Sequence, residues 1–138
     1  GVPVGAFVMN ENVAQKSLMP GDHGTTYGGN PLVGAAVTKV LEMMERDHIP
    51  AHVREVGAYL AKRLDELVAR HDCLTARRGV GLMQGVACTK KVCDISAKAL
   101  EHGLVVITAG SDVLRFVPPL VIEKAHVDEM VEKLEACL

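Results

Sequence analysis

Residues 73–88 read CLTARRGVGLMQGVAC, and this stretch decides the fold. Glycines interrupt it and no helical period survives, which favours strands over a helix. The simplest interpretation is two strands, Cys73–Arg78 and Leu82–Cys88, that are joined through Gly79 and Gly81. The stretch therefore predicts a hairpin within a small sheet.

The same glycines do not form a dinucleotide-binding motif. In GVGLMQG (79–85) the third glycine comes four residues after the second, and no helix opens behind it. The strand–turn–helix context that a dinucleotide needs is missing. We therefore interpret these glycines as turn residues.

The flanking segments predict the rest of the sheet and its cover. A helix from near Pro50 to near His71 has apolar residues at three- and four-residue spacing. Downstream we expect a helix over 92–102 that Gly103 ends, a buried strand over 104–108, a second strand over 113–117 and a last helix over 124–138. This order predicts an α/β (α+β sandwich) domain, in which a small sheet is covered by helices.

The beginning of the chain is glycine-rich and does not obviously belong to that sheet. We expect a strand over residues 2–9 and a short helix over 12–18, which Pro20 and Gly21 stop. Asn30 and Pro31 are typical of a helix start, with Asn30 as N-cap, and this helix should run to about Arg46.

Composition limits the classes of function. The chain has 138 residues, 49% of them hydrophobic and 3% aromatic, and its net charge is −2. These values favour one compact domain with an aliphatic core and speak against a nucleic-acid partner or a membrane surface. The four cysteines are scattered, which favours reduced, mostly buried thiols and a cytoplasmic protein. The chain opens on a glycine without an initiator Met, as after tag removal or a cut inside a longer protein.

The loop GDHGTTYGGNP (21–31) is the first candidate site. Thr25 and Thr26 offer hydroxyls beside glycines, and a helix N-terminus follows, which favours an anion such as a phosphate or a carboxylate. The alternative is a glycine-rich connection whose hydroxyls only cap the turn. The residues alone leave both interpretations open.

Arg115 is the second candidate, because it interrupts the apolar run VLRFV. Either its side chain points to solvent, or it points inward and needs a carboxylate from the protein or a ligand. His48 and His52 are spaced like metal ligands, but Pro50 lies between them, so we expect no metal site. No catalytic residue set stands out in the chain.

The segments GVPVGAF, GDHGTTYGGNPL, GVGLMQGV and GLVVITAGSDVLRFVPPL together resemble the C-terminal part of the class III aminotransferases, which use pyridoxal phosphate. The resemblance covers the whole chain and is strongest to the branch that moves an amino group between N-acetylornithine and 2-oxoglutarate in arginine biosynthesis. It implies the aspartate-aminotransferase-like fold. Residues 1–30 would be a remnant of the large cofactor domain, and residues 31–138 the small C-terminal domain.

The resemblance also implies roles for the candidate residues. Thr26 would bind the cofactor phosphate of the neighbouring subunit in a homodimer, Thr25 would lie at the substrate side of that site, and Arg115 would pair with a glutamate or a substrate carboxylate. The lysine that forms the Schiff base would lie upstream of Gly1, so this chain alone is expected to be inactive and to bind the cofactor weakly or not at all. The alternatives are a stand-alone anion-binding or dimerisation module, or an aminotransferase for ornithine or 4-aminobutyrate.

Overall fold

A computed structural model describes residues 2–19 and 21–138 of the chain. The chain forms two compact units, residues 1–47 and residues 48–138, and each is described by itself. The first unit contains two helices, α1 (Glu11–Ser17) and α2 (Pro31–Arg46). The second unit contains the other helices and all strands of the described chain, namely α3 (Ile49–Arg70), β1 (Leu74–Val80), β2 (Met83–Cys88), α4 (Val92–Glu101), β3 (Ile107–Ala109), β4 (Val113–Phe116) and α5 (Lys124–Glu135).

The second unit is built on a four-stranded antiparallel sheet in the order β1-β2-β4-β3. β1 and β2 form the hairpin expected from residues 73–88, and Val80 pairs with Met83 at its tip. The turn depends on two left-handed glycines, Gly79 with φ 135° and Gly81 with φ 55°, where a side chain would be strained. The hairpin interpretation of the glycine-rich stretch is confirmed.

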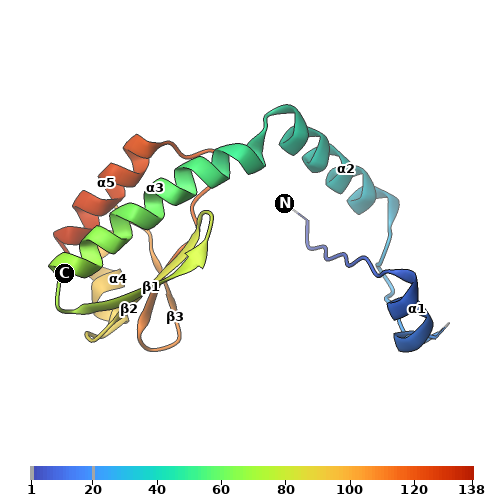
Figure 1. The fold of residues 1–138 in the computed structure, drawn as a ribbon, viewed down its shortest axis with the longest axis horizontal. Helices are drawn as coiled ribbons and strands as arrows, with labels where there is room; N and C mark the ends of the chain where they lie inside the picture. The colour runs from blue at the N-terminus through green and yellow to red at the C-terminus, as the bar shows by residue number, and fades with distance from the viewer. Residues whose placement is uncertain (1, 20) are drawn as a thin grey trace. The chain divides into compact units, whose positions relative to one another are not determined.

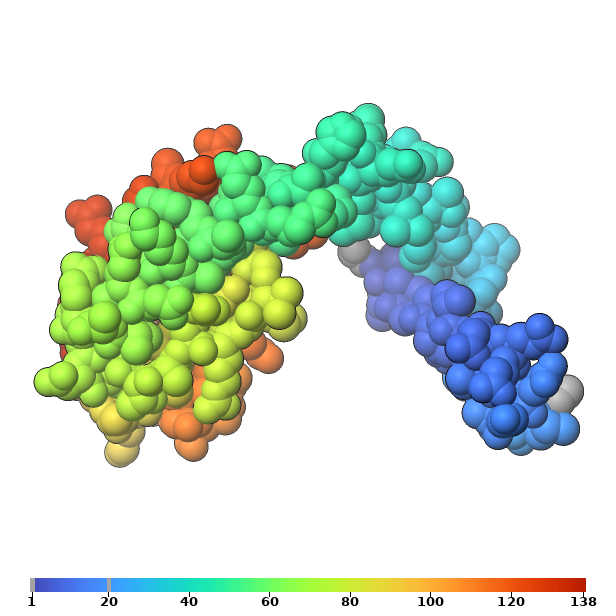
Figure 2. Space-filling model, viewed as in Figure 1, coloured from blue at the N-terminus to red at the C-terminus, as the bar shows by residue number. Residues whose placement is uncertain are grey.

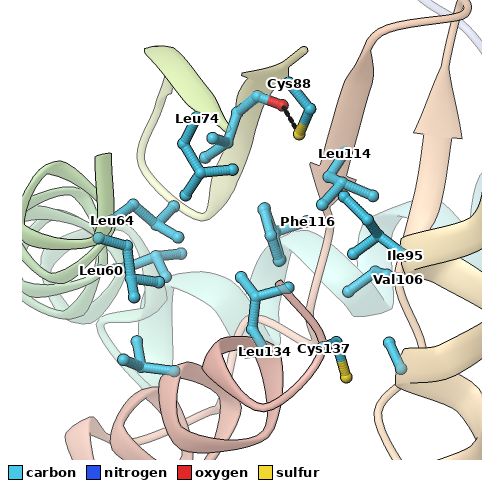
Figure 3. Packing of buried hydrophobic residues seen from close by; sticks show 14 of the residues in the cluster. Leu60, Leu64, Leu74, Cys88, Ile95, Val106, Leu114, Phe116, Leu134 and Cys137 are labelled. Carbon is cyan, nitrogen blue, oxygen red and sulfur yellow. Dashed lines mark hydrogen bonds between the residues drawn. The ribbon is translucent and has the colours of Figure 1, made fainter. Parts of the chain in front are cut away.

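The helices of this unit supply one continuous hydrophobic core against the sheet. Leu64 of α3 and Leu114 of β4 are 0% exposed. Figure 3 shows Leu64, Ile95 of α4 and Leu134 of α5 converging on Phe116, the only aromatic side chain in the buried cluster. Aliphatic packing thus fixes three helices on the sheet, as the low aromatic content predicts.

α3 approaches the hairpin so closely that both contact positions are glycine. A Cβ placed on Gly57 would lie 2.6–2.7 Å from backbone atoms of Gly81. In the space-filling view the hairpin, coloured yellow-green, lies directly beneath α3, coloured green (Figure 2). The long amphipathic helix and the turn therefore determine each other's position.

The first unit has little core of its own. Neither α1 nor α2 buries a residue. Each helix nevertheless begins with an Asn cap, because Asn10 Oδ1 accepts from Val13 N and Asn30 Oδ1 accepts from Val33 N, both at 3.0 Å. The predicted helices over 12–18 and 31–46 are confirmed, apart from Pro20, which lies outside the described residues.

Two strand predictions are wrong. Residues 2–9 form no strand, because a strand needs a neighbour to satisfy its backbone groups and none pairs with this segment in the described chain. The strand expected over 104–108 is reduced to β3, and β3 is not buried, since Ile107 is 39% exposed. Leu104 N instead donates to Ala99 O at 2.8 Å, a bond that belongs to the end of α4. The residues between α4 and β3 therefore do not join the strand pairing.

The remaining elements of the second unit agree with the sequence. α3, α4 and α5 lie where the periodicity predicts them (Figure 1). Gly103 follows α4 with φ 72°, as expected of a helix stop. The fold is α/β with helices on a small antiparallel sheet. The domain boundary expected between residues 30 and 31 stays a prediction about the longer parent protein.

Candidate functional site

The loop before α2 is a series of tight turns with its side chains exposed. Asp22 Oδ2 accepts from Met19 N at 2.8 Å, and Gly28 N donates to Thr25 O at 3.3 Å. Asn30 Nδ2 donates to Tyr27 O at 2.9 Å while its Oδ1 caps α2. The sequence therefore folds locally, and Asn30 joins the loop to the helix.

Thr25 and Thr26 are both exposed, and in the described chain neither hydroxyl makes a hydrogen bond. The turn is capped by Asn30 and closed by backbone bonds, so the threonine hydroxyls are not used as capping groups. A glycine is favoured at position 28, because a Cβ there would lie 2.3 Å from the Thr25 methyl group. The hydroxyls are thus available for an external acceptor.

This loop supplies only part of a binding site for a phosphate such as that of pyridoxal phosphate. Hydroxyl and backbone N–H donors suit a phosphate oxygen. Residues 21–31 contain no Lys or Arg, and Asp22 adds a negative charge. Neutral donors at an exposed turn need further groups from another part of the protein to hold a dianion.

Arg115 lies on β4, between Gly85 of β2 and Ile107 of β3 in the pairing register. Its side chain is exposed, and among the described residues it has no hydrogen bond or ion pair. Of the two orientations open from the sequence, the exposed one is observed. The guanidinium is free to meet a carboxylate from outside residues 48–138.

An apolar hollow of about 390 Å³ adjoins Arg115. Phe116 and Val117 line it from the sheet side, and Ile122 and Met130 line it from the segment that ends in α5. Its size is that of an ordinary small-molecule or side-chain pocket. Thr25 and Thr26 belong to the first unit and Arg115 belongs to the second, so they are described as two separate candidate sites.

Other candidates from the sequence have structural roles. His52 Nε2 lies 2.8 Å from Ile122 O, which joins α3 to the segment before α5. No three His, Cys, Asp or Glu side chains of residues 2–19 and 21–138 cluster as metal ligands would. Cys88 is buried, and burial raises the pKa of its thiol. None of the helices in this part of the chain is both long and apolar enough to cross a bilayer.

Sequence reasoning missed Arg78. It pairs with Gly85 across β1 and β2, and Gly85 pairs with Arg115 across β2 and β4. Strand alternation therefore places both arginines on one face of the sheet, either side of a glycine. Only the strand order shows that Arg78 lies near Arg115, and the sequence alone does not give that order.

Comparison with known proteins agrees with the geometry. The sequence matches the family described as Aminotransferase class-III over residues 1–138. It is 43% identical to the acetylornithine aminotransferase of Aquifex aeolicus over 138 residues, which are 100% of this chain and 35% of that protein. It is 37% identical to the succinylornithine transaminase of Photorhabdus laumondii, again over 100% of this chain and 35% of the relative.

A solved structure shares the fold. The acetylornithine aminotransferase of Elizabethkingia anophelis is similar with a TM-score of 0.78 and 25% identity, over 87% of this chain and 31% of that one. The chain thus spans about a third of the length of the relatives that it matches. With a family match along its whole length and these identities, the chain belongs to the class-III aminotransferases.

Proposed function

We propose that this chain is the C-terminal part of an aminotransferase that moves an amino group between N-acetylornithine and 2-oxoglutarate in arginine biosynthesis. The observation that carries the proposal is the family match over all 138 residues, together with 43% identity to an acetylornithine aminotransferase. The parent protein uses pyridoxal phosphate, which supplies the electron sink for the reaction when it is bound. We place the protein in the cytoplasm, where its unpaired cysteines stay reduced.

In this proposal the Thr26 hydroxyl donates a hydrogen bond to the cofactor phosphate at the site of the neighbouring subunit. The support is chemical: the hydroxyl is exposed and unused, and its loop lacks the cations that a complete phosphate site needs. Thr25 lies beside it on the substrate side. A homodimer then explains why a site fragment sits on an exposed loop.

Arg115 binds a substrate carboxylate in the parent protein. Its guanidinium is exposed and, in the described part of the chain, without a carboxylate partner. A planar guanidinium binds a carboxylate through two parallel hydrogen bonds, which fixes the direction of the substrate as well as its charge.

The isolated chain is inactive under this proposal, because the lysine that holds the cofactor lies outside residues 1–138. Neither candidate residue replaces it, since a threonine hydroxyl and a guanidinium bind and orient but do not hold an aldehyde. Weak cofactor binding, or none, is expected for residues 1–138 alone.

The test uses the parent protein with Thr26→Ala and the matched control Thr26→Ser. Loss of one hydrogen bond to a charged group, about 1.5–3 kcal/mol, lowers cofactor affinity about 10- to 150-fold. Thr26→Ser, which keeps the hydroxyl, retains most of the affinity. Equal cofactor affinity in the wild type and Thr26→Ala, measured by equilibrium dialysis, would remove Thr26 from the proposal.

A further inference from the structure

Gln84 is the only amide or charged side chain that is buried in the described part of the chain, where it is 3% exposed. Burying an amide is costly unless its hydrogen-bonding groups find partners. Both ends of this amide are bonded, because Gln84 Oε1 accepts from Arg77 Nη1 at 3.0 Å and Gln84 Nε2 donates to Gly81 O at 2.8 Å. A satisfied polar group inside an apolar core holds its surroundings in one arrangement.

These hydrogen bonds belong to a chain that runs from α3 to the hairpin turn. Arg77 Nε donates to Asp65 Oδ1 at 2.7 Å, which ties β1 to α3. The same guanidinium bonds to Gln84 on β2, and Gln84 bonds to the turn at Gly81. We call the side chains of Asp65, Arg77 and Gln84, with the Gly81 carbonyl, the hairpin lock. The hairpin lock joins a helix, two strands and their turn.

The hairpin lock holds a segment that is flexible by composition. Positions 79, 81 and 85 are glycines, which lose more conformational freedom on folding than any other residue. Gly85 also has no side chain that could pack β2 against the neighbouring strands. Gln84 comes directly before Gly85, so its two hydrogen bonds fix the β2 backbone where the glycine does not.

Arg115 lies beside this end of β2. Gln84 and Phe116 form the last pair of the β2–β4 ladder, and the pair before them joins Gly85 to Arg115. On the other side of β4, Arg115 pairs with Ile107, where the β3–β4 ladder also ends. The backbone position of Arg115 therefore depends on how the Gln84 end of β2 is held.

We infer that Gln84, held by Arg77 and Asp65, is a positioning residue that fixes how Arg115 presents its guanidinium to a substrate carboxylate. This role rests on the proposed function, in which Arg115 binds that carboxylate. A guanidinium and a carboxylate form two parallel hydrogen bonds in one relative orientation, so a small shift of the β4 backbone weakens the pair. The hairpin lock acts through the β2–β4 pairing and does not touch the substrate.

The experiment is Gln84→Met in the parent protein, because methionine has a similar length but neither an amide donor nor an amide acceptor. We expect the KM for 2-oxoglutarate to rise about 10-fold, since a displacement of about 1 Å can cost about 100-fold. The kcat and the affinity for pyridoxal phosphate should stay close to those of the wild type, because only binding of the carboxylate is weakened.

Val131→Ala is the matched control. It removes buried atoms from α5 and destabilises the second unit, but it leaves the hairpin lock intact. It should lower the melting temperature and leave the KM for 2-oxoglutarate unchanged.

Arg77→Met keeps the test sharp if Gln84→Met does not fold, because the Arg77 side chain is 23% exposed and lies outside the buried core. It should also raise the KM for 2-oxoglutarate. Arg77→Met combined with Gln84→Met should raise this KM no further than Gln84→Met alone, since both substitutions break one chain of hydrogen bonds.

Hydrogen exchange of the 138-residue chain gives a readout that needs no activity. In Gln84→Met, the amides of residues 84–86 and 114–116 should lose protection relative to the rest of the second unit. In Val131→Ala they should not. Unchanged relative protection of these amides in Gln84→Met would overturn the positioning role.

The positioning role is also overturned by an unchanged KM in folded Gln84→Met and Arg77→Met, or by an equal rise in Val131→Ala. Arg115→Lys separates this failure from failure of the proposed function. If Arg115→Lys raises the KM for 2-oxoglutarate while the hairpin-lock variants do not, only the positioning role fails. If Arg115→Lys leaves this KM unchanged, the proposed role of Arg115 fails, and the positioning role fails with it.

Discussion

The substitution Gly57→Ala should destabilise the second unit, although alanine is the better helix former. Gly57 lies inside α3, where alanine is worth about 1 kcal/mol more than glycine. The new Cβ would stand 2.6 Å from the Gly81 carbonyl carbon, while ordinary contact begins at 3.4 Å. The helix and the hairpin must therefore separate by roughly 0.8 Å, the difference between these two values.

That separation is costly because a backbone meets a backbone. Overpacking costs about 1–3 kcal/mol, and the upper part of that range applies where no side chain can rotate away. Gly81 itself is held at φ 55° in the turn, so it has little room to retreat. After the gain in helix propensity, we expect a net loss of about 2 kcal/mol in the free energy of unfolding.

Urea denaturation of the chain measures this loss, and Gly34→Ala is the matched control. Gly34 is also a helical glycine, but nothing lies within 4 Å of a Cβ placed there. The control should stabilise α2 by up to about 1 kcal/mol. Circular dichroism should show this as a stronger helical signal. If Gly57→Ala stabilised the second unit as alanine in a free helix does, the close approach of α3 to the hairpin would be refuted.

Three further predictions concern the same unit. Leu114→Ala removes a fully buried side chain and should cost about 2–5 kcal/mol in urea unfolding; a cost below that of an exposed-site control would contradict the core described above. His71, with Arg70, lowers the pKa of Glu135, so ionised Glu135 stabilises the folded state above the unfolded pKa, and this stabilisation is lost as the pH falls below about 4.5. Glu135→Gln should therefore reduce the loss of stability at acid pH, by less than about 1 kcal/mol. An unchanged acid limb of the stability curve would count against the pairing. A thiol reagent should modify exposed Cys93 at once and buried Cys88 only on unfolding, which mass spectrometry can follow; early modification of Cys88 would show that β2 is not protected.

The sequence was sufficient for elements with strong local signals. Asn30 and Pro31 mark the start of α2 by a cap whose hydrogen bond is local, and the glycines of the hairpin have positive φ at the turn itself. The spacing of Leu60, Leu64 and Leu67 likewise marks the buried side of α3. These features depend on residues a few positions apart, so composition and period predict them.

Features that depend on distant residues were not predictable. Residues 2–9 have the composition of a strand, but no neighbour pairs with them in the described chain. Arg78 became a candidate functional residue only when the strand order β1-β2-β4 placed it across Gly85 from Arg115. The contact of Gly57 with Gly81 also joins segments that no local pattern connects.

The central claim is that the parent protein transfers an amino group from N-acetylornithine to 2-oxoglutarate. The most direct measurement is a steady-state assay of the parent protein, loaded with pyridoxal phosphate, with 2-oxoglutarate against N-acetylornithine, ornithine and 4-aminobutyrate. We predict that kcat/KM is highest for N-acetylornithine and that Arg115→Lys raises the KM for 2-oxoglutarate. A higher kcat/KM for ornithine or 4-aminobutyrate, or no amino transfer from any donor by the loaded protein, would contradict the claim.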